Sequence, residues 1–106
     1  MKAFLYIGDD KVGEVEFKII DESMGAIGGN LSTYADYGKY QTHIQNLYET
    51  KGIANIEDLA FRIILGDNSK LNPEGGIGVT DSKEFEDIYV EAAGLESEII
   101  NKICII

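Results

Sequence analysis

Two apolar runs joined by a short polar turn, close to the start of the chain, are the pattern that most restricts the fold. Residues 3–7 form the first run, and Gly8-Asp9-Asp10-Lys11 ends it. From residue 12 to residue 20, apolar and charged side chains then alternate, with Val15, Phe17 and Ile19 on the apolar face. A period of two is typical of a strand that is buried on one side. The pattern predicts an opening β-hairpin whose outer face carries charge.

The middle of the chain predicts one main helix. Residues 21–33 hold three glycines without a clear period, which favours a loop or a short, bulged strand. After them, apolar and aromatic residues recur at spacings of three and four, which predicts a helix over about 36–50 that stops at Gly52. The residues on this stripe are Tyr37, Tyr40, Ile44, Leu47 and Tyr48.

The second half of the chain predicts further strands. Residues 59–65 alternate and are rich in β-branched and aromatic types, so we expect a central strand there. A long surface turn over 66–76 and a brief strand over 77–80 follow. Residues 85–92 fit a strand, although a helix fits part of the same stretch, and residues 95–106 fit a short helix or an edge strand.

This order of elements predicts an α+β domain, a mostly antiparallel sheet packed against one main helix. A doubly wound parallel sheet would need a helix after each strand, and the chain lacks those helices. At 106 residues the length suits a single domain covering residues 1–106, without a repeat or a linker.

No arrangement of residues specifies a reaction. The glycine clusters at 25–30 and 75–80 lack the spacing and the lysine of nucleotide-binding loops, so we interpret them as turns. His43 is the only histidine and is expected to face solvent, while Cys104 is interpreted as a buried apolar residue. We therefore expect no catalytic residue, no metal site and no cofactor, and hence a protein that is not an enzyme.

Charge is the composition feature that bears on function. Nineteen acidic residues against nine basic ones give a net charge of −10, with a pI of about 4.3. Such a surface repels nucleic acid and anionic membranes, and it can steer a basic partner into encounter. The first apolar run is too short for a signal peptide or a membrane span, so we expect a cytoplasmic protein.

The acidic residues are concentrated in two segments. Residues 81–98 contain seven of them against Lys83 alone, and residues 9–22 contain six against two lysines. If the two segments are neighbours in the sheet, they form one anionic face. A plainer interpretation is that both are ordinary solvated faces that keep a small protein soluble. Aromatic residues nearby would supply the contacts that carry binding energy. The candidate partner-binding residues are Glu84, Glu86, Asp87, Tyr89, Glu91, Glu14, Glu16, Tyr34 and Tyr37.

A small, acidic, cysteine-poor domain with a stretch such as Glu84-Phe85-Glu86-Asp87-Ile88-Tyr89-Val90-Glu91 resembles the bacterial immunity proteins that neutralise basic nuclease toxins. It also resembles small phage inhibitors that imitate nucleic acid. The first resemblance implies a non-catalytic inhibitor whose acidic face covers a basic active site. One alternative is an assembly subunit or homo-oligomer that uses the isoleucine-rich end, Ile99-Ile100 and residues 103–106.

Overall fold

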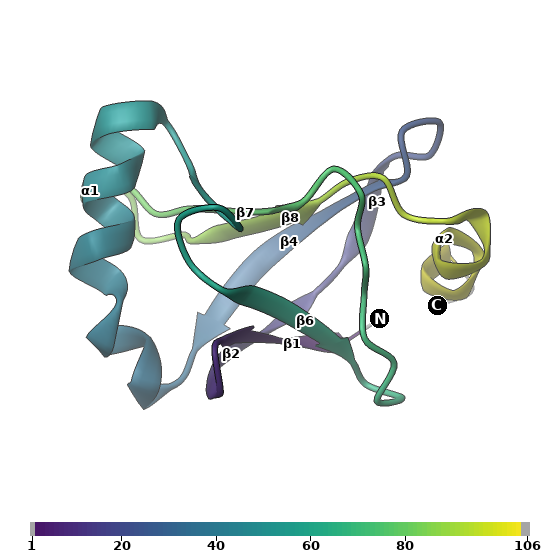
Figure 1. Ribbon diagram of the computed structural model, residues 1–106, viewed down its shortest axis with the longest axis horizontal. Helices are drawn as coiled ribbons and strands as arrows, with labels where there is room; N and C mark the ends of the chain where they lie inside the picture. Colours follow the sequence, from purple (N-terminus) through teal and green to yellow (C-terminus); the bar gives the residue numbers. More distant parts are fainter. Residues whose placement is uncertain (1, 105–106) are drawn as a thin grey trace.

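The strands form one antiparallel sheet that curls around its own apolar face. The computed structural model describes residues 2–104, and the fold is α+β, as predicted (Figure 1). In chain order, the elements are β1 (Lys2–Ile7), β2 (Asp10–Glu16), β3 (Lys18–Asp21), β4 (Ala26–Thr33), the 3-10 helix η1 (Ala35–Lys39), α1 (Gln41–Lys51), β5 (Ala54–Asn55), β6 (Phe61–Leu65), β7 (Ile77–Thr80), β8 (Tyr89–Ala92) and α2 (Ser97–Cys104).

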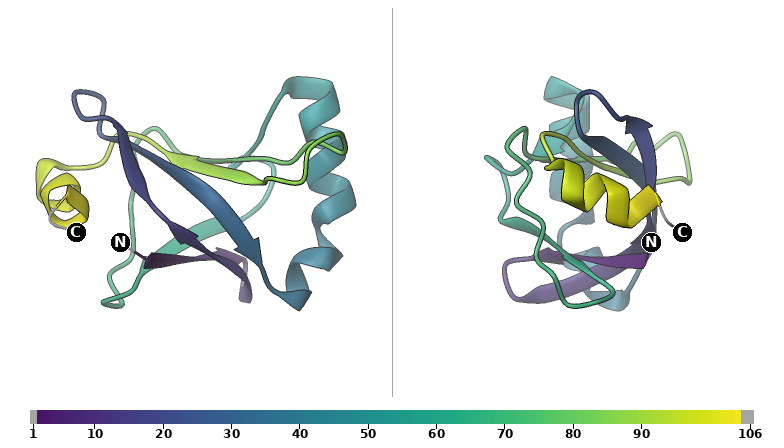
Figure 2. Two further views of the ribbon diagram at one scale, coloured as in Figure 1. Left: turned by 180° about the vertical axis from the view of Figure 1, so that it is seen from behind. Right: turned by 90° about the vertical axis from the view of Figure 1, so that its right-hand side faces the viewer.

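The strand order in the sheet is β5-β7-β8-β4-β2-β1-β6, and β3 pairs with β4 beside this path. β1, β2 and β6 form one side of the curl, β7 and β8 form the other, and the long strand β4 connects them (Figures 1 and 2). The two α-helices stand at opposite ends of the long axis. β5 and β6, the two ends of the strand order, do not pair with each other, so the sheet stays open there.

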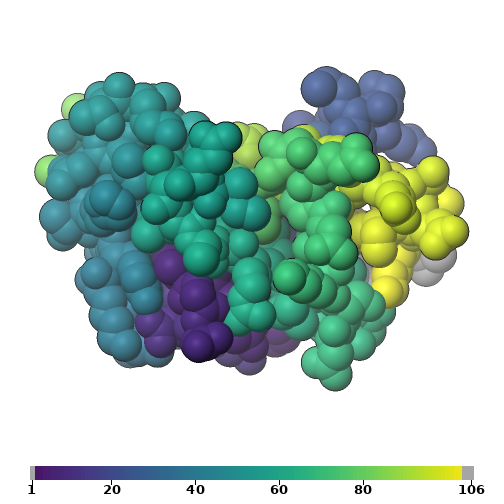
Figure 3. Space-filling view, in the orientation of Figure 1, coloured from purple at the N-terminus to yellow at the C-terminus, as the bar shows by residue number. Residues whose placement is uncertain are grey.

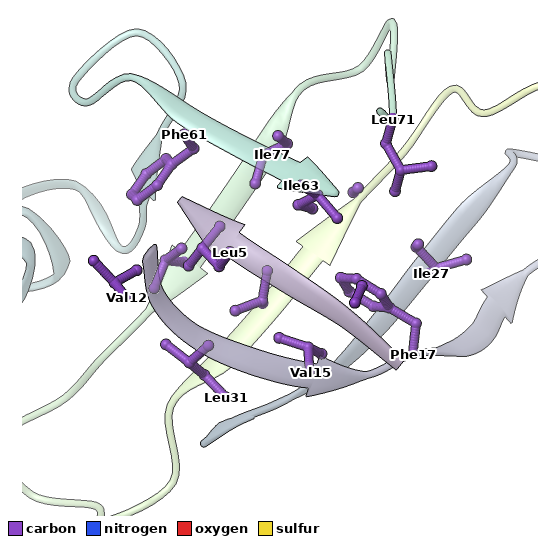
Figure 4. Close-up of a cluster of buried hydrophobic side chains, with 14 of the residues drawn as sticks. Leu5, Val12, Val15, Phe17, Ile27, Leu31, Phe61, Ile63, Leu71 and Ile77 are labelled. Atoms are coloured by element: carbon purple, nitrogen blue, oxygen red, sulfur yellow. The ribbon is translucent and has the colours of Figure 1, made fainter. Parts of the chain in front are cut away.

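The core fills the inside of the curl. Leu5, Val12, Ile27, Leu65 and Val90 are fully buried there, together with side chains from the other strands (Figure 4). Removing this apolar surface from water is the main force that closes the sheet.

The opening hairpin and the main helix are confirmed. β1 and β2 pair in antiparallel fashion around a turn in which Gly8 has a φ of 59°. α1 ends at Gly52, which has a left-handed φ of 87° and whose backbone N–H donates to the Tyr48 carbonyl. The helix is divided, however, because residues 35–39 form η1 and the α-helix begins only after Tyr40. His43 is exposed, as expected.

Three local expectations need correction. Of the two alternatives for the glycine-rich stretch, a loop or a short, bulged strand, the structure has a strand over residues 26–33, but β4 is the longest of the described strands and pairs with β2, β3 and β8. β6 alternates as predicted, but it is an end strand of the sheet and not a central one. β8 begins only at Tyr89, so residues 81–88 form a loop. Of the two alternatives given for the end of the chain, a short helix or an edge strand, the structure has the helix α2.

The described isoleucines of the C-terminal segment pack inside the molecule. Ile100 and Ile103 are only 3% and 4% exposed, and Ile99 packs against the same core. These residues therefore offer little apolar surface for the assembly role considered above. The expected burial of Cys104 and the role of residues 105–106 lie outside the described residues.

Candidate functional site

The loop between β7 and β8 combines an exposed aromatic ring with exposed carboxylates. Phe85 is 67% exposed, more than any other large apolar side chain in residues 2–104. Glu84, Glu86 and Asp87 surround it in the chain and are exposed as well. We call residues 83–87 the acidic loop. It lies beside α1, at the end of the molecule opposite α2 (Figure 2).

A buried carboxylate lies just before the acidic loop in the chain. Asp81 is 1% exposed and accepts three hydrogen bonds from η1 and α1. Tyr37 Oη donates to Oδ2 at 2.8 Å, Gln41 Nε2 to the same oxygen at 3.4 Å, and Gln45 Nε2 to Oδ1 at 3.1 Å. All three donors are neutral, and no ion pair of Asp81 occurs within residues 2–104. A buried charge is tolerated only when hydrogen bonds replace its water, so these donors hold the loop root in place.

The spacing of these donors in the sequence explains why all three reach Asp81. Tyr37, Gln41 and Gln45 follow one another at intervals of four, which places them on one side of the helical segment. Burial, and then the hydrogen bond to Asp81, raise the pKa of Tyr37 well above its ordinary value. Tyr37 therefore stays a neutral donor at physiological pH.

Short hydrogen bonds shape the loop itself. Ser82 is buried, its Oγ accepts from the Glu84 N–H at 3.2 Å, and its carbonyl accepts from the Phe85 N–H at 3.2 Å. At the other end, Ile88 is 7% exposed and its carbonyl accepts from the Leu31 N–H. The residues on both sides of the acidic loop are thus buried and hydrogen-bonded, while residues 83–87 are exposed.

The acids of the loop differ from those of the first hairpin in their partners. Asp9, Asp10 and Glu14 lie 3.2 to 4.0 Å from the basic groups of Arg62, Lys39 and Lys2. Glu84, Glu86 and Asp87 form no ion pair with any residue in 2–104. The one cation of the loop, Lys83, contacts Glu49 of α1 at 3.5 Å. The negative charge of these three residues is therefore not neutralised by an ion pair within residues 2–104.

Tyr89, Glu91 and Glu16 lie apart from the loop tip. Tyr89 and Glu91 alternate with the buried Val90 and Ala92, so they face outward from β8. Tyr89 packs beside Ile20 over Gly28, where the absence of a side chain lets both approach the strand. Glu16 and Tyr89 line the same shallow hollow on this outer face.

One sequence expectation about the site is wrong. Tyr37 was expected to contact a partner, but it is 2% exposed and bonded to Asp81, because its hydroxyl satisfies the buried carboxylate. The sequence left open whether the two acidic segments are neighbours in the sheet, and the structure places β4 between β2 and β8, so the condition for one anionic face is not met. Glu14 sits on β2 in its pair with Lys2, and Tyr34, 37% exposed, precedes η1.

Sequence reasoning missed Asp81 and Phe85. The polar residues at intervals of four, Gln41 and Gln45, pointed toward a buried acceptor, and Phe85 stood out as an aromatic residue among carboxylates. In the strand expected over 85–92, Ile88, Val90 and Ala92 share one face and Phe85 lies on the other, so that assignment gave no reason to place Phe85 in a loop.

No protein-family model, curated protein sequence or solved structure matches this chain. In the part of the chain that the structure describes, no group of three or more His, Cys, Asp or Glu side chains could hold a metal ion. Neither helix within residues 2–104 has the length and apolar character needed to cross a membrane.

Proposed function

We propose that this protein is a non-catalytic inhibitor that binds a basic protein through the acidic loop, in the manner of an immunity protein that neutralises a toxin such as a nuclease. The observation that carries the proposal is the exposed Phe85 among three carboxylates without ion pairs, on a loop whose ends are buried.

The three carboxylates supply attraction at a distance. Charges of one sign on an exposed loop raise the rate at which an oppositely charged protein arrives in the correct orientation. A nuclease active site is basic because it must bind phosphates, so its positive charge complements the negative charge of the loop. Like-charged surfaces, including nucleic acid, are repelled.

Phe85 supplies an anchor. Aromatic side chains that enter a desolvated pocket carry much of the binding energy at protein interfaces, while the surrounding polar rim excludes water. The hydrogen bonds of Asp81 and Ser82 hold the loop before binding, which reduces the conformational entropy lost on association. Inhibition is then steric and electrostatic, with the loop covering the active site of the toxin.

The test uses the C-terminal domain of the protein encoded by the gene next to that of this chain. Immunity proteins are produced together with their toxins, so this domain should be basic, toxic when expressed alone, and harmless when co-expressed with the chain. A variant carrying Phe85→Ala with Glu84→Lys, Glu86→Lys and Asp87→Lys should lose protection and the 1:1 complex.

The matched control places the same changes at other sites. Met24 is 65% exposed, and Glu22, Glu57 and Glu74 are exposed acids. Met24→Ala with Glu22→Lys, Glu57→Lys and Glu74→Lys changes the net charge equally and should keep protection. A neighbouring domain that is not toxic, or equal loss of protection in both variants, contradicts the proposal.

A further inference from the structure

The sheet leaves an opening between its two end strands, and that opening contains a hollow. β5 and β6 do not pair, and the segments 56–60 and 66–76 border the space between β6 and β7 (Figure 1). A hollow of about 540 Å³ lies between these segments. In Figure 3 the surface of residues 53–61, in teal, stands on one side and that of residues 70–76, in green, on the other.

The wall of the hollow is largely apolar. Its deep side is formed by Phe61, Leu71 and Ile77, which belong to the core (Figure 4). Ile56 stands at the edge and is 46% exposed, so part of its apolar side chain is accessible to a ligand in the hollow. Small-molecule sites are typically hollows of about 300–1,000 Å³ with apolar walls and few polar groups, and the mouths of β-barrels are a common location.

The charge of this hollow is opposite to that of the molecule. Arg62 and Lys70 line it and no acidic residue does, whereas three other hollows on the surface each include at least one glutamate. Arg62 is held by the Gly8 carbonyl at 2.7 and 3.1 Å and lies 5.0 Å from the centre of the Tyr6 ring. Lys70 is exposed and forms no ion pair with any residue in 2–104.

We infer that this hollow binds a small organic anion with an apolar body, such as a medium-chain carboxylate. The apolar body lies against Ile56 and the core side chains, and the carboxylate pairs with Lys70. An apolar group gains free energy by leaving water, and a carboxylate at the rim keeps its hydration while it gains an opposite charge. The site is independent of the acidic loop, from which it differs in residues, charge and ligand.

The experiment titrates the full-length, ¹⁵N-labelled protein with decanoate below its micellar concentration, followed by amide NMR. The expected result is a saturable 1:1 curve with the largest shifts at Ile56, Phe61, Leu71 and Ile77. Lys70→Glu should weaken binding by about tenfold or more, since it replaces attraction by repulsion. Ile56→Ser, an exposed position whose change leaves the core intact, should weaken it as well.

Two controls separate the inference from unspecific binding. Lys18, like Lys70, is exposed, lines a different hollow and forms no ion pair within residues 2–104, so Lys18→Glu should leave the affinity within about twofold. Decanol, which has the same chain without the charge, should bind wild type and Lys70→Glu equally. Shifts that do not saturate, shifts centred on other residues, or an equal loss of decanoate affinity in Lys70→Glu and Lys18→Glu would overturn the inference.

Discussion

Tyr37 Oη donates a hydrogen bond to Asp81 Oδ2 at 2.8 Å, and this contact joins the 3-10 helix η1 to the residue that follows β7. Gln41 and Gln45 donate to the same carboxylate from α1. The carboxylate therefore ties the helical segment to the root of the acidic loop. Loss of any of these donors should loosen the loop as well as lower stability.

Tyr37→Phe tests how much the first of these donors contributes to stability. The substitution keeps the ring and removes the donor, so the buried Asp81 loses one of its three hydrogen bonds. We expect the free energy of unfolding to fall by about 1–3 kcal/mol, measured by urea denaturation. Tyr48→Phe is the control, because no hydrogen bond of the Tyr48 hydroxyl occurs within residues 2–104. Equal stability of the two variants would show that the Tyr37 contact is not significant.

Asp81→Asn tests the carboxylate itself. An amide has one acceptor oxygen in place of two, so its NH₂ group must face one of the three donors, Tyr37, Gln41 or Gln45. Amide hydrogen exchange of residues 82–87 should become faster, and the free energy of unfolding should fall by about 1–3 kcal/mol. If exchange in the loop is unchanged, Asp81 does not position the loop.

Alanine substitutions at two adjacent glycines of β4 should lower stability by different amounts. A Cβ at Gly29 would overlap the backbone carbonyl of Glu16 and approach Val15 Cγ1 to 2.8 Å, so the backbone would have to move. A Cβ at Gly28 would meet only the ends of Tyr89 and Ile20, two exposed side chains that can rotate away. Gly29→Ala should cost about 1–3 kcal/mol by thermal or urea unfolding, and Gly28→Ala less than about 1 kcal/mol. The reverse order would contradict this packing.

The same glycines explain which parts of the fold the sequence predicts. The hairpin, α1 and its stop at Gly52 follow from local periodicity and turn chemistry, and the structure confirms them. β4 was predicted only as one of two alternatives, and as a short strand, because Gly28 and Gly29 weaken any strand pattern and the close approach of Glu16 that requires Gly29 is a long-range contact. The position of β6 at the end of the sheet is likewise set by pairing that no local pattern contains.

The site was only partly predictable for a related reason. The acids at 84, 86 and 87 are evident from composition, and the structure leaves them exposed. Their pairing state depends on which lysines fold back onto which carboxylates, as Lys83 does onto Glu49. The buried role of Tyr37 depends on Asp81, which is 44 residues away in the chain.

Acid sensitivity should be measurable where α2 meets the 66–70 turn. Lys102 contacts Asp67 and Ser69, and hydrogen bonds from Lys102 and then Ser69 lower the pKa of Asp67 from 3.8 to about 2. The folded-state pKa is below the unfolded one, so the stabilisation is complete above pH 3.8 and is lost as the pH falls through about 2. The free energies of unfolding of wild type and Lys102→Met, measured with urea, should differ by a constant amount above about pH 4, and this difference should disappear between pH 4 and 2. A difference that persists unchanged at the lowest pH contradicts this assignment.

The most direct test of the account measures the rate at which the protein associates with the basic domain encoded by the neighbouring gene. Stopped-flow traces are recorded between about 25 and 500 mM NaCl, a range over which the screening length falls severalfold. For wild type and for the control triple reversal of Glu22, Glu57 and Glu74, the association rate constant should fall steeply with salt. For the reversal of Glu84, Glu86 and Asp87 it should be at least about tenfold lower at low salt and should not fall as salt rises. A loop-reversed protein that associates as fast as wild type at low salt would contradict the claim that the acidic loop is the binding site.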